Sequence, residues 1–118
     1  MNLPEPAVSG QRFTRQQRLL TAGQFKNIFR RGRRLRLDSL ELITLSNDFG
    51  QPRLGVVVPK RCVKLAVRRN TIKRWARESF RRRQQRLPVG DIILQVRGQV
   101  VTFAQVEAAM ERLCGAAP

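Results

Sequence analysis

The most constraining feature of this chain is the stretch from Arg53 to Leu87, where a short apolar run leads into a densely basic segment. Between Lys60 and Arg86 the segment holds twelve lysines and arginines and a single acid, Glu78. Its mostly apolar side chains recur with helical spacing and fall on one arc, which predicts a long helix with one face against a core. The residues of that arc are Leu65, Ile72, Trp75, Ala76, Ser79 and Phe80.

The cations of this segment share the flank of the predicted helix that lies next to the apolar arc. Exposed helix faces usually place an acid four residues before each cation, and here only Glu78 is available. A solvated charged face is the simpler interpretation, but such a strip repels itself unless an anion lies along it. We therefore predict a polyanion-binding helix. Its preference for arginine suits phosphate, which a guanidinium grips with two parallel hydrogen bonds.

Composition narrows the choice of partner. A formal net charge of +16 and a pI near 11.9 indicate nucleic acid first and an anionic membrane surface second. No apolar run approaches the roughly 18 residues of a membrane span, and the first residues lack a secretory leader pattern, so a cytoplasmic location is expected. With no histidine and only two cysteines, Cys62 and Cys114, the chain offers neither a usual zinc site nor the commonest general base.

The order of predicted elements indicates an α+β fold, a single domain with a mixed sheet of about four strands and helices packed on it. Thr21 and Gln24 have the spacing of a capping box, which opens a helix that Gly32 ends. The order is α-β-β-(β)-α-β-α, with residues 1–11 as a flexible tail and residues 12–118 as the domain. Besides the basic helix, the predicted elements are a helix over Ala22–Arg31, strands over Ser39–Ser46, Arg53–Pro59 and Asp91–Arg97, and a helix that opens at Thr102.

A second block of cations precedes the first predicted strand. From Arg12 to Arg36 there are nine basic residues and no acid, so 21 of the 24 cations fall into two blocks. Phe25 and Phe29 lie four residues apart on the first predicted helix, where core packing is the default interpretation and stacking on a nucleobase is the alternative. Concentration of charge on this scale indicates a binding footprint more than a means of staying in solution.

Several short runs match one protein family. They are Arg18-Leu19, Phe25, Phe29, Gly32, Arg53-Leu54-Gly55, Lys60-Arg61, Val63-Lys64, Ala66-Val67, Arg69-Asn70, Ile72-Lys73-Arg74 and Arg77-Glu78-Ser79-Phe80. Together they resemble the signature of the bacterial ribonuclease P protein subunit, whose hallmark is an Arg-Asn-Arg run at the start of a basic helix. The resemblance extends from about Phe13 to Leu113, and the third residue of the hallmark run is Thr71 here.

The resemblance implies a protein that assists a catalytic RNA in removing the 5′ leader from precursor tRNA. It also implies a left-handed β-α-β crossover, where general physical preference favours the right-handed form. The protein would carry no catalytic residue, no metal and no cofactor, and Mg²⁺ would be bound by the partner RNA. The chain fits this expectation because it lacks the closely spaced carboxylates that two-metal hydrolysis needs.

Two sets of site residues follow from the charge blocks and the resemblance. Asn70 is expected either to donate to a phosphate or to cap the backbone beside Lys64. At Ile43, where related proteins can present an aromatic ring, apolar contact is expected. Contact with the catalytic RNA is predicted for Lys60, Arg61, Lys64, Arg68, Arg69, Asn70, Lys73, Arg74 and Arg77. Contact with the precursor tRNA leader is predicted for Phe13, Arg15, Arg18, Phe25, Phe29, Ile43 and Val57.

Three other functions are compatible with the sequence. A ribosomal or nucleoid-type binding protein would share the charge, but it would bind mature RNA or duplex DNA as well as precursor. A self-sufficient nuclease would cleave precursor without an RNA partner. A membrane-active basic helix fits least, because the cationic flank adjoins a core that the strands need.

Overall fold

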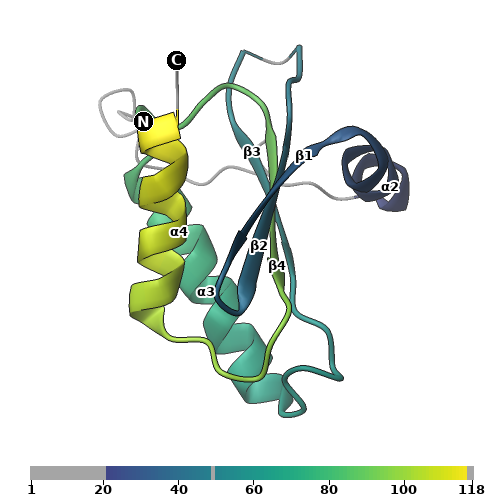
Figure 1. Ribbon diagram of the computed structural model, residues 1–118, viewed down its shortest axis with the longest axis vertical. Coiled ribbons are helices and arrows are strands. Elements are labelled where there is room, and N and C mark those ends of the chain that lie inside the picture. Colours follow the sequence, from purple (N-terminus) through teal and green to yellow (C-terminus); the bar gives the residue numbers. More distant parts are fainter. Residues whose placement is uncertain (1–20, 49, 117–118) are drawn as a thin grey trace, which may run out of the picture.

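The computed structural model describes residues 21–48 and 50–116, which form a four-stranded sheet with helices on both faces (Figure 1). α2 lies on one face of the sheet, and α3 and α4 cover the other. None of the described helices is both long and apolar enough to cross a membrane. The elements in chain order are α2 (Ala22–Arg31), β1 (Arg33–Leu37), β2 (Leu40–Leu45), β3 (Arg53–Val57), α3 (Ala66–Arg82), β4 (Asp91–Val96) and α4 (Phe103–Ala116).

The sheet is mixed and has the strand order β1-β2-β4-β3. β1 and β2 form an antiparallel hairpin, β2 pairs antiparallel with β4, and β3 pairs parallel with β4. A parallel pair needs a crossover connection, which α3 supplies between β3 and β4. A buried ion pair joins the first residues of these two strands, since Arg53 donates to the two carboxylate oxygens of Asp91 at 2.7 and 2.8 Å.

The larger hydrophobic core lies between the sheet and the helices α3 and α4. Alternate strand residues point into it, as the two-residue period of a strand requires. From α3, Ile72, Ala76 and Phe80 are fully buried, which confirms the predicted apolar arc at these positions. Their partners in the strands and in α4 include Leu40, Leu42, Leu54, Ile92, Leu94, Val96, Val106, Ala109 and Met110.

A second, smaller core lies beneath α2. Ile28 packs there against Ile43 and Ile93, and each of the three is at most 1 % exposed. Gly32 ends α2 as predicted, but its backbone is in an ordinary extended conformation with φ −76°, so a glycine is needed for space. A Cβ on Gly32 would lie 2.6 Å from the carbonyl oxygen of Ile28 and 2.6 Å from Cγ2 of Ile43. The missing side chain therefore allows α2 to lie close against β2.

Two details of the fold differ from the expectation. Arg33–Leu37 forms the edge strand β1, although the sequence shows this segment first as a run of cations. Leu65, expected on the buried arc of the basic helix, is 66 % exposed. It is the N-cap of α3 and has extended backbone angles (φ −80°, ψ 125°), so the 100° step of a helix does not reach it.

Candidate nucleic-acid interface

The first candidate surface consists of the loop after β3 and the N-terminal part of α3. The loop leaves Lys60, Arg61 and Lys64 exposed, and the helix adds the exposed side chains of Arg68 and Arg74. This is the segment in which the sequence predicts contact with the catalytic RNA. We call its nine predicted residues the α3 cluster: Lys60, Arg61, Lys64, Arg68, Arg69, Asn70, Lys73, Arg74 and Arg77.

Arg69 fixes the backbone at the start of α3. Its Nη1 donates to the carbonyl oxygens of Val63 (3.0 Å) and Lys64 (2.8 Å). Because the N-cap residue of α3 makes no side-chain cap, these two bonds tie the incoming loop to the helix. Capping of the backbone beside Lys64, one of the two roles expected for Asn70, is thus performed by Arg69. Asn70 itself is exposed.

Thr71 occupies the position at which the family hallmark has its third residue, an arginine. Its hydroxyl donates to the carbonyl oxygen of Val67 at 3.0 Å, so it is turned back onto the preceding helical turn. Val67 itself is 71 % exposed. Val67 and Thr71 thus contribute no charge to α3, and the positive charge of the α3 cluster comes from its other residues.

Within residues 21–48 and 50–116, most cations of the α3 cluster have no acidic partner. The first turn of α3 contains no acid, and the helix dipole adds a partial positive charge at this N-terminus. Such a surface attracts anions strongly. Among the described residues, no carboxylate forms an ion pair with Lys60, Arg61, Lys64, Arg68, Arg69, Lys73 or Arg74.

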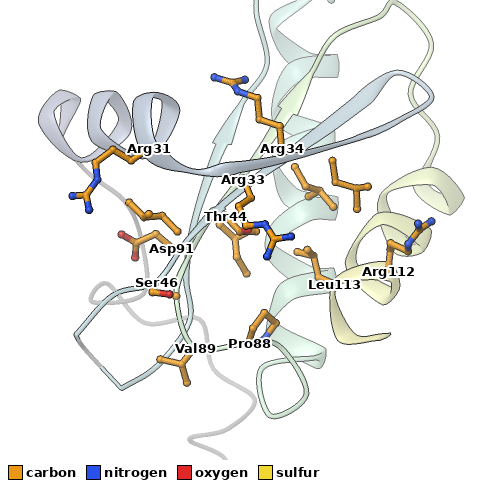
Figure 2. Close-up of a pocket in the computed structure, with 15 residues that line it drawn as sticks. Arg31, Arg33, Arg34, Thr44, Ser46, Pro88, Val89, Asp91, Arg112 and Leu113 are labelled. Atoms are coloured by element: carbon orange, nitrogen blue, oxygen red, sulfur yellow. The ribbon is translucent and has the colours of Figure 1, made fainter. Parts of the chain in front are cut away.

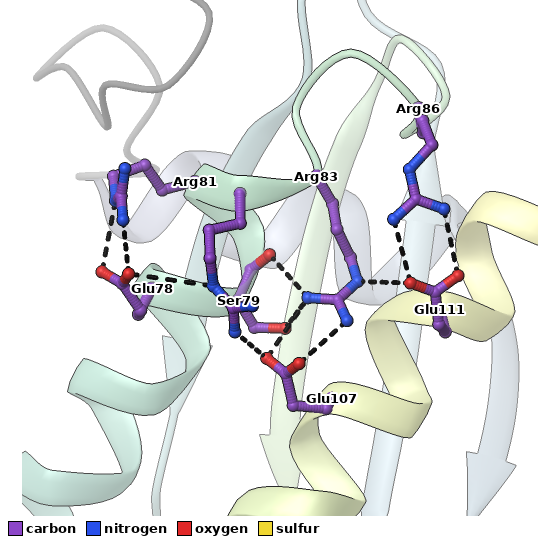
Figure 3. A network of polar contacts seen from close by, with 8 residues as sticks. Glu78, Ser79, Arg81, Arg83, Arg86, Glu107 and Glu111 are labelled. Atoms are coloured by element: carbon purple, nitrogen blue, oxygen red, sulfur yellow. Dashed lines mark hydrogen bonds and ion pairs between the residues drawn. The ribbon is translucent and has the colours of Figure 1, made fainter.

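The C-terminal part of the basic segment is compensated, contrary to the expectation of an almost unpaired strip (Figure 3). α4 places Glu107 and Glu111 beside it, and Arg83 donates to both carboxylates at 2.9 Å. Arg86 donates to Glu111 through two bonds of 3.1 and 2.9 Å. We call the whole set the α3–α4 network: Glu78, Arg81, Arg82, Arg83, Arg86, Glu107 and Glu111.

The α3–α4 network keeps its carboxylates ionised. Hydrogen bonds from Arg86 and Arg83 lower the pKa of Glu111 to about 2. The hydrogen bond from Arg83 likewise lowers the pKa of Glu107. Arg83 is buried and also donates to Oγ of Ser79 at 2.8 Å, so its guanidinium is held on every side. These ion pairs hold the end of the basic segment against α4, and the acids of the network neutralise the charge of its arginines.

The second candidate surface combines α2 with the sheet face beneath it. Phe25 and Phe29 are half-buried: each packs on the small core of Ile28, Ile43 and Ile93 and leaves part of its ring in solvent. The core interpretation of this aromatic pair is confirmed in part, and stacking on a nucleobase stays a prediction. The rings stabilise the packing of α2 on the sheet, and their exposed parts are accessible to a ligand.

Arg34 of β1 lies against Phe29. Its guanidinium carbon is 5.6 Å from the ring centroid, within the range of a cation–π contact, and its Nη2 donates to the carbonyl oxygen of Phe29 at 2.9 Å. Glu41 pairs with Arg34 (3.4 Å) and with Arg97 (3.5 Å). Sequence reasoning missed Arg34 and Arg97 as members of this surface. For Arg34 the available signal was the strand alternation in β1, which turns successive residues to opposite faces.

Ile43 lies outside the exposed part of this surface. Apolar contact with RNA is predicted for Ile43 from the sequence, but Ile43 is 0 % exposed because its side chain fills the small core between Ile28 and Ile93. Val57 is half-buried at the margin of the same core. The remaining candidates for contact with the leader, Phe13, Arg15 and Arg18, lie outside the described residues.

The arrangement of polar groups is that of a binding surface. In the described part of the chain, no three Asp, Glu or Cys side chains gather into a group suited to a metal ion. Cys62 and Cys114 are separate, half-buried free thiols. The exposed features on the two surfaces are guanidinium and ammonium groups and two partly open aromatic rings. These groups recognise phosphates and nucleobases.

Comparison with known proteins agrees with this geometry. The family model described as Ribonuclease P matches residues 13–117. The ribonuclease P protein components of Vibrio vulnificus and Vibrio parahaemolyticus are each 43 % identical to the chain over 82 residues, which make up 70 % of this chain and 70 % of each relative.

Solved structures agree as well. The ribonuclease P protein from Thermotoga maritima is 31 % identical with a TM-score of 0.73, over 86 % of this chain and 98 % of that one. The protein from Staphylococcus aureus is 27 % identical with a TM-score of 0.74, over 84 % and 93 %. Its fold and strand order are consistent with those of this chain, including the crossover through α3. By sequence and by fold, this chain belongs to the ribonuclease P protein family.

Proposed function

We propose that this chain, as the protein subunit of ribonuclease P, binds the catalytic RNA through the α3 cluster and holds the 5′ leader of precursor tRNA on the surface of α2. Bound to both RNAs, it neutralises their phosphates and brings substrate and catalytic RNA together at lower Mg²⁺ concentration. The assembly works in the cytoplasm. The family match decides against the ribosomal or nucleoid-type alternative.

The observation that carries this proposal is the separation of unpaired from paired cations along the basic segment Lys60–Arg86, which α3 and its flanking loops form. Acids lie beside Arg82, Arg83 and Arg86, where α3 must be fastened to α4. They are missing beside Lys60, Lys64 and the other unpaired cations of the α3 cluster among the described residues. Since unpaired like charges cost stability, their retention at one end of α3 is best explained by an anionic partner.

The hydrolysis is assigned to the RNA because five of the eight carboxylates, those of Glu41, Glu78, Asp91, Glu107 and Glu111, are in ion pairs with arginine. Asp91 binds Arg53, and Glu41 lies between Arg34 and Arg97. Two-metal hydrolysis requires several carboxylates that converge on ions roughly 4 Å apart. On this proposal Mg²⁺ is bound by the catalytic RNA and the protein contributes no group to the reacting phosphate.

The leader is expected to lie across α2 and the neighbouring sheet face. Phe25 offers the open part of its ring for stacking, which is worth about 1–3 kcal/mol per base and tolerates any sequence. Phe29 already carries Arg34 against its ring, so a nucleotide here meets an aromatic ring and a cation together. Val57 supplies apolar contact at the margin, and the buried Ile43 supports the surface from below.

Reconstitution with a cognate catalytic RNA tests the proposal. Cleavage of precursor tRNA at low Mg²⁺ should require the protein, and Lys64→Gln/Arg74→Gln should weaken binding of the catalytic RNA. Affinity falls as salt rises, and each lost phosphate contact makes the slope of log affinity against log salt shallower by about 0.7–0.9. The matched control is Arg82→Gln/Arg86→Gln, which removes the same charge from paired arginines.

Equal losses in the two double variants would show that net charge, and not the α3 cluster, determines binding. Unchanged affinity and slope in Lys64→Gln/Arg74→Gln would remove the cluster from the interface. Cleavage of precursor by the protein without RNA would assign the chemistry to the protein and overturn the division of labour.

A further inference from the structure

A cavity of about 550 Å³ opens beside the edge strand β1, at the end of the sheet where β2 finishes and β4 begins. Figure 2 shows Arg33 reaching over Thr44 toward Leu113, with Arg112 on the neighbouring part of α4. Leu35 adds to the apolar lining. The guanidinium of Arg33 thus lies beside an apolar wall, and Arg112 lines the rim with its guanidinium turned away from Arg33. Arg31 and Arg34 also belong to the lining.

Arg33 and Arg112 have no acidic partner among the described residues. The acidic residue of the lining, Asp91, does not neutralise them, because Arg53 binds both of its carboxylate oxygens and Asn47 donates to one of them at 2.7 Å. The cavity therefore has a net positive charge that no acid among the described residues neutralises.

This cavity lies mainly on the α4 side of β1, although Arg31 of α2 and Arg34 also line it. Within β1, Leu35 and Leu37 pack on the larger core, so Arg33, two residues before Leu35, faces α4. Arg34 faces the opposite side and lies against Phe29. The edge strand therefore presents cations on both faces of the sheet, and an RNA that follows it could contact both.

We propose that this cavity binds a nucleotide of one of the RNAs of the complex, with its phosphate on the guanidinium of Arg33 at the rim, where the exposed Arg112 adds positive charge, and its base against Leu35 and Leu113. The volume falls in the range of about 300–1,000 Å³ found for sites that enclose small ligands. The guanidinium of Arg33 can donate two parallel hydrogen bonds to a phosphate, and the hydroxyl of Thr44 adds a donor at the floor. The inference rests on the proposed function in taking RNA as the partner, and it adds a third contact.

The double variant Arg33→Gln/Arg112→Gln tests this proposal, with Arg82→Gln/Arg86→Gln as the control of equal charge. Binding is measured separately for the catalytic RNA, the leader-bearing precursor and mature tRNA, over a range of salt concentrations. For the RNA that occupies the cavity, the slope of log affinity against log salt should become shallower by about 0.7–0.9. This change corresponds to roughly fivefold weaker binding near 0.15 M salt. The control should bind that RNA as the wild type does.

A second readout does not depend on affinity. A photoreactive amino acid placed at Val89, which lines the cavity and is 52 % exposed, should crosslink to the same RNA in the reconstituted complex. The crosslink should disappear in Arg33→Gln/Arg112→Gln, whose fold is checked by its melting temperature.

Wild-type affinity and slope for all three RNAs in the double variant, or no crosslink from Val89, would overturn the cavity site. The proposed function would then still stand, provided that the wild-type protein binds the catalytic RNA and supports cleavage. Failure of the wild-type protein to bind any of the three RNAs would instead refute the proposed function, and the cavity site with it.

Discussion

Replacing Gly32 by alanine tests whether α2 depends on a missing side chain for its place on the sheet. The added Cβ would lie 2.6 Å from the carbonyl oxygen of Ile28, 2.6 Å from Cγ2 of Ile43 and 2.9 Å from the carbonyl oxygen of Thr44. Ordinary van der Waals contact begins at 3.4 Å. Two of the obstacles are backbone oxygens, and the oxygen of Ile28 also accepts the hydrogen bond from the N–H of Gly32 at 2.7 Å. The two backbone oxygens cannot move without displacing α2 or β2.

Overpacking of this kind destabilises a protein by about 1–3 kcal/mol. We expect about 2 kcal/mol for Gly32→Ala, because Ile43 is 0 % exposed and has no free volume to enter. For a domain of this size, each kcal/mol lowers the melting temperature by about 4 °C, so a decrease of about 8 °C is expected in thermal unfolding followed by circular dichroism. Gly23→Ala is the matched control. The nearest atom to its new Cβ is Oγ1 of Thr21 at 4.0 Å, and alanine is the better helix former, so its melting temperature should rise slightly.

The same variant tests whether the position of α2 on the sheet affects RNA binding. Because α2 carries Phe25 and Phe29, its displacement should weaken binding of leader-bearing precursor more than binding of the catalytic RNA. A Gly32→Ala protein that melts at the wild-type temperature would refute the argument from space. Equal loss for both RNAs would show that α2 and the α3 cluster do not act as separate surfaces.

Three further perturbations test the fold and the site. Asp91→Ala should cost about 3–5 kcal/mol in urea unfolding, because it leaves the guanidinium of Arg53 buried without its partner; a loss below 1 kcal/mol would contradict this. The lowered pKa values of Glu107 and Glu111 stabilise the fold fully above about pH 4.5, and this contribution is lost as the pH falls toward 2. Glu111→Gln should therefore show a shallower loss of stability between these pH values than the wild type, and an identical acid profile would exclude the pairing. Phe25→Leu should weaken binding of leader-bearing precursor more than binding of leaderless product, whereas equal weakening would show that the ring serves only to pack the core.

The predictions that succeeded rest on interactions between residues close in sequence. The capping box of Thr21 and Gln24 forms as expected, with bonds of 3.0 and 3.1 Å, because both partners lie within one helical turn. The buried positions Ile72 and Phe80 follow from the helical period alone. Such patterns require no knowledge of what the helix packs against, so the sequence was enough to predict them.

The errors arise where a distant element decides the outcome. β1 is a five-residue strand whose alternation is hidden by three arginines, and pairing with β2 makes it a strand. Ile43 sits on a strand that alternates regularly, but nothing in that strand tells which of its faces α2 will cover. The partners in the pair Arg83–Glu107 are 24 residues apart, so counting acids four residues from each cation could not find it.

The placement of the acids explains how one basic helix serves both fold and binding. Arg83 is buried, and an unpaired buried guanidinium would destabilise the fold, so acids on α4 must accompany it. Arg74 is exposed, where water screens its charge and the cost of leaving it unpaired is small. An acid placed beside Arg74 would stabilise α3 only slightly and would compete with phosphate for the guanidinium. A chain that must bind RNA therefore has reason to concentrate its few carboxylates at the α3–α4 contact and to keep them away from the α3 cluster. On this argument, introducing Glu at Asn70, four residues before Arg74, should leave the melting temperature nearly unchanged and weaken binding of the catalytic RNA.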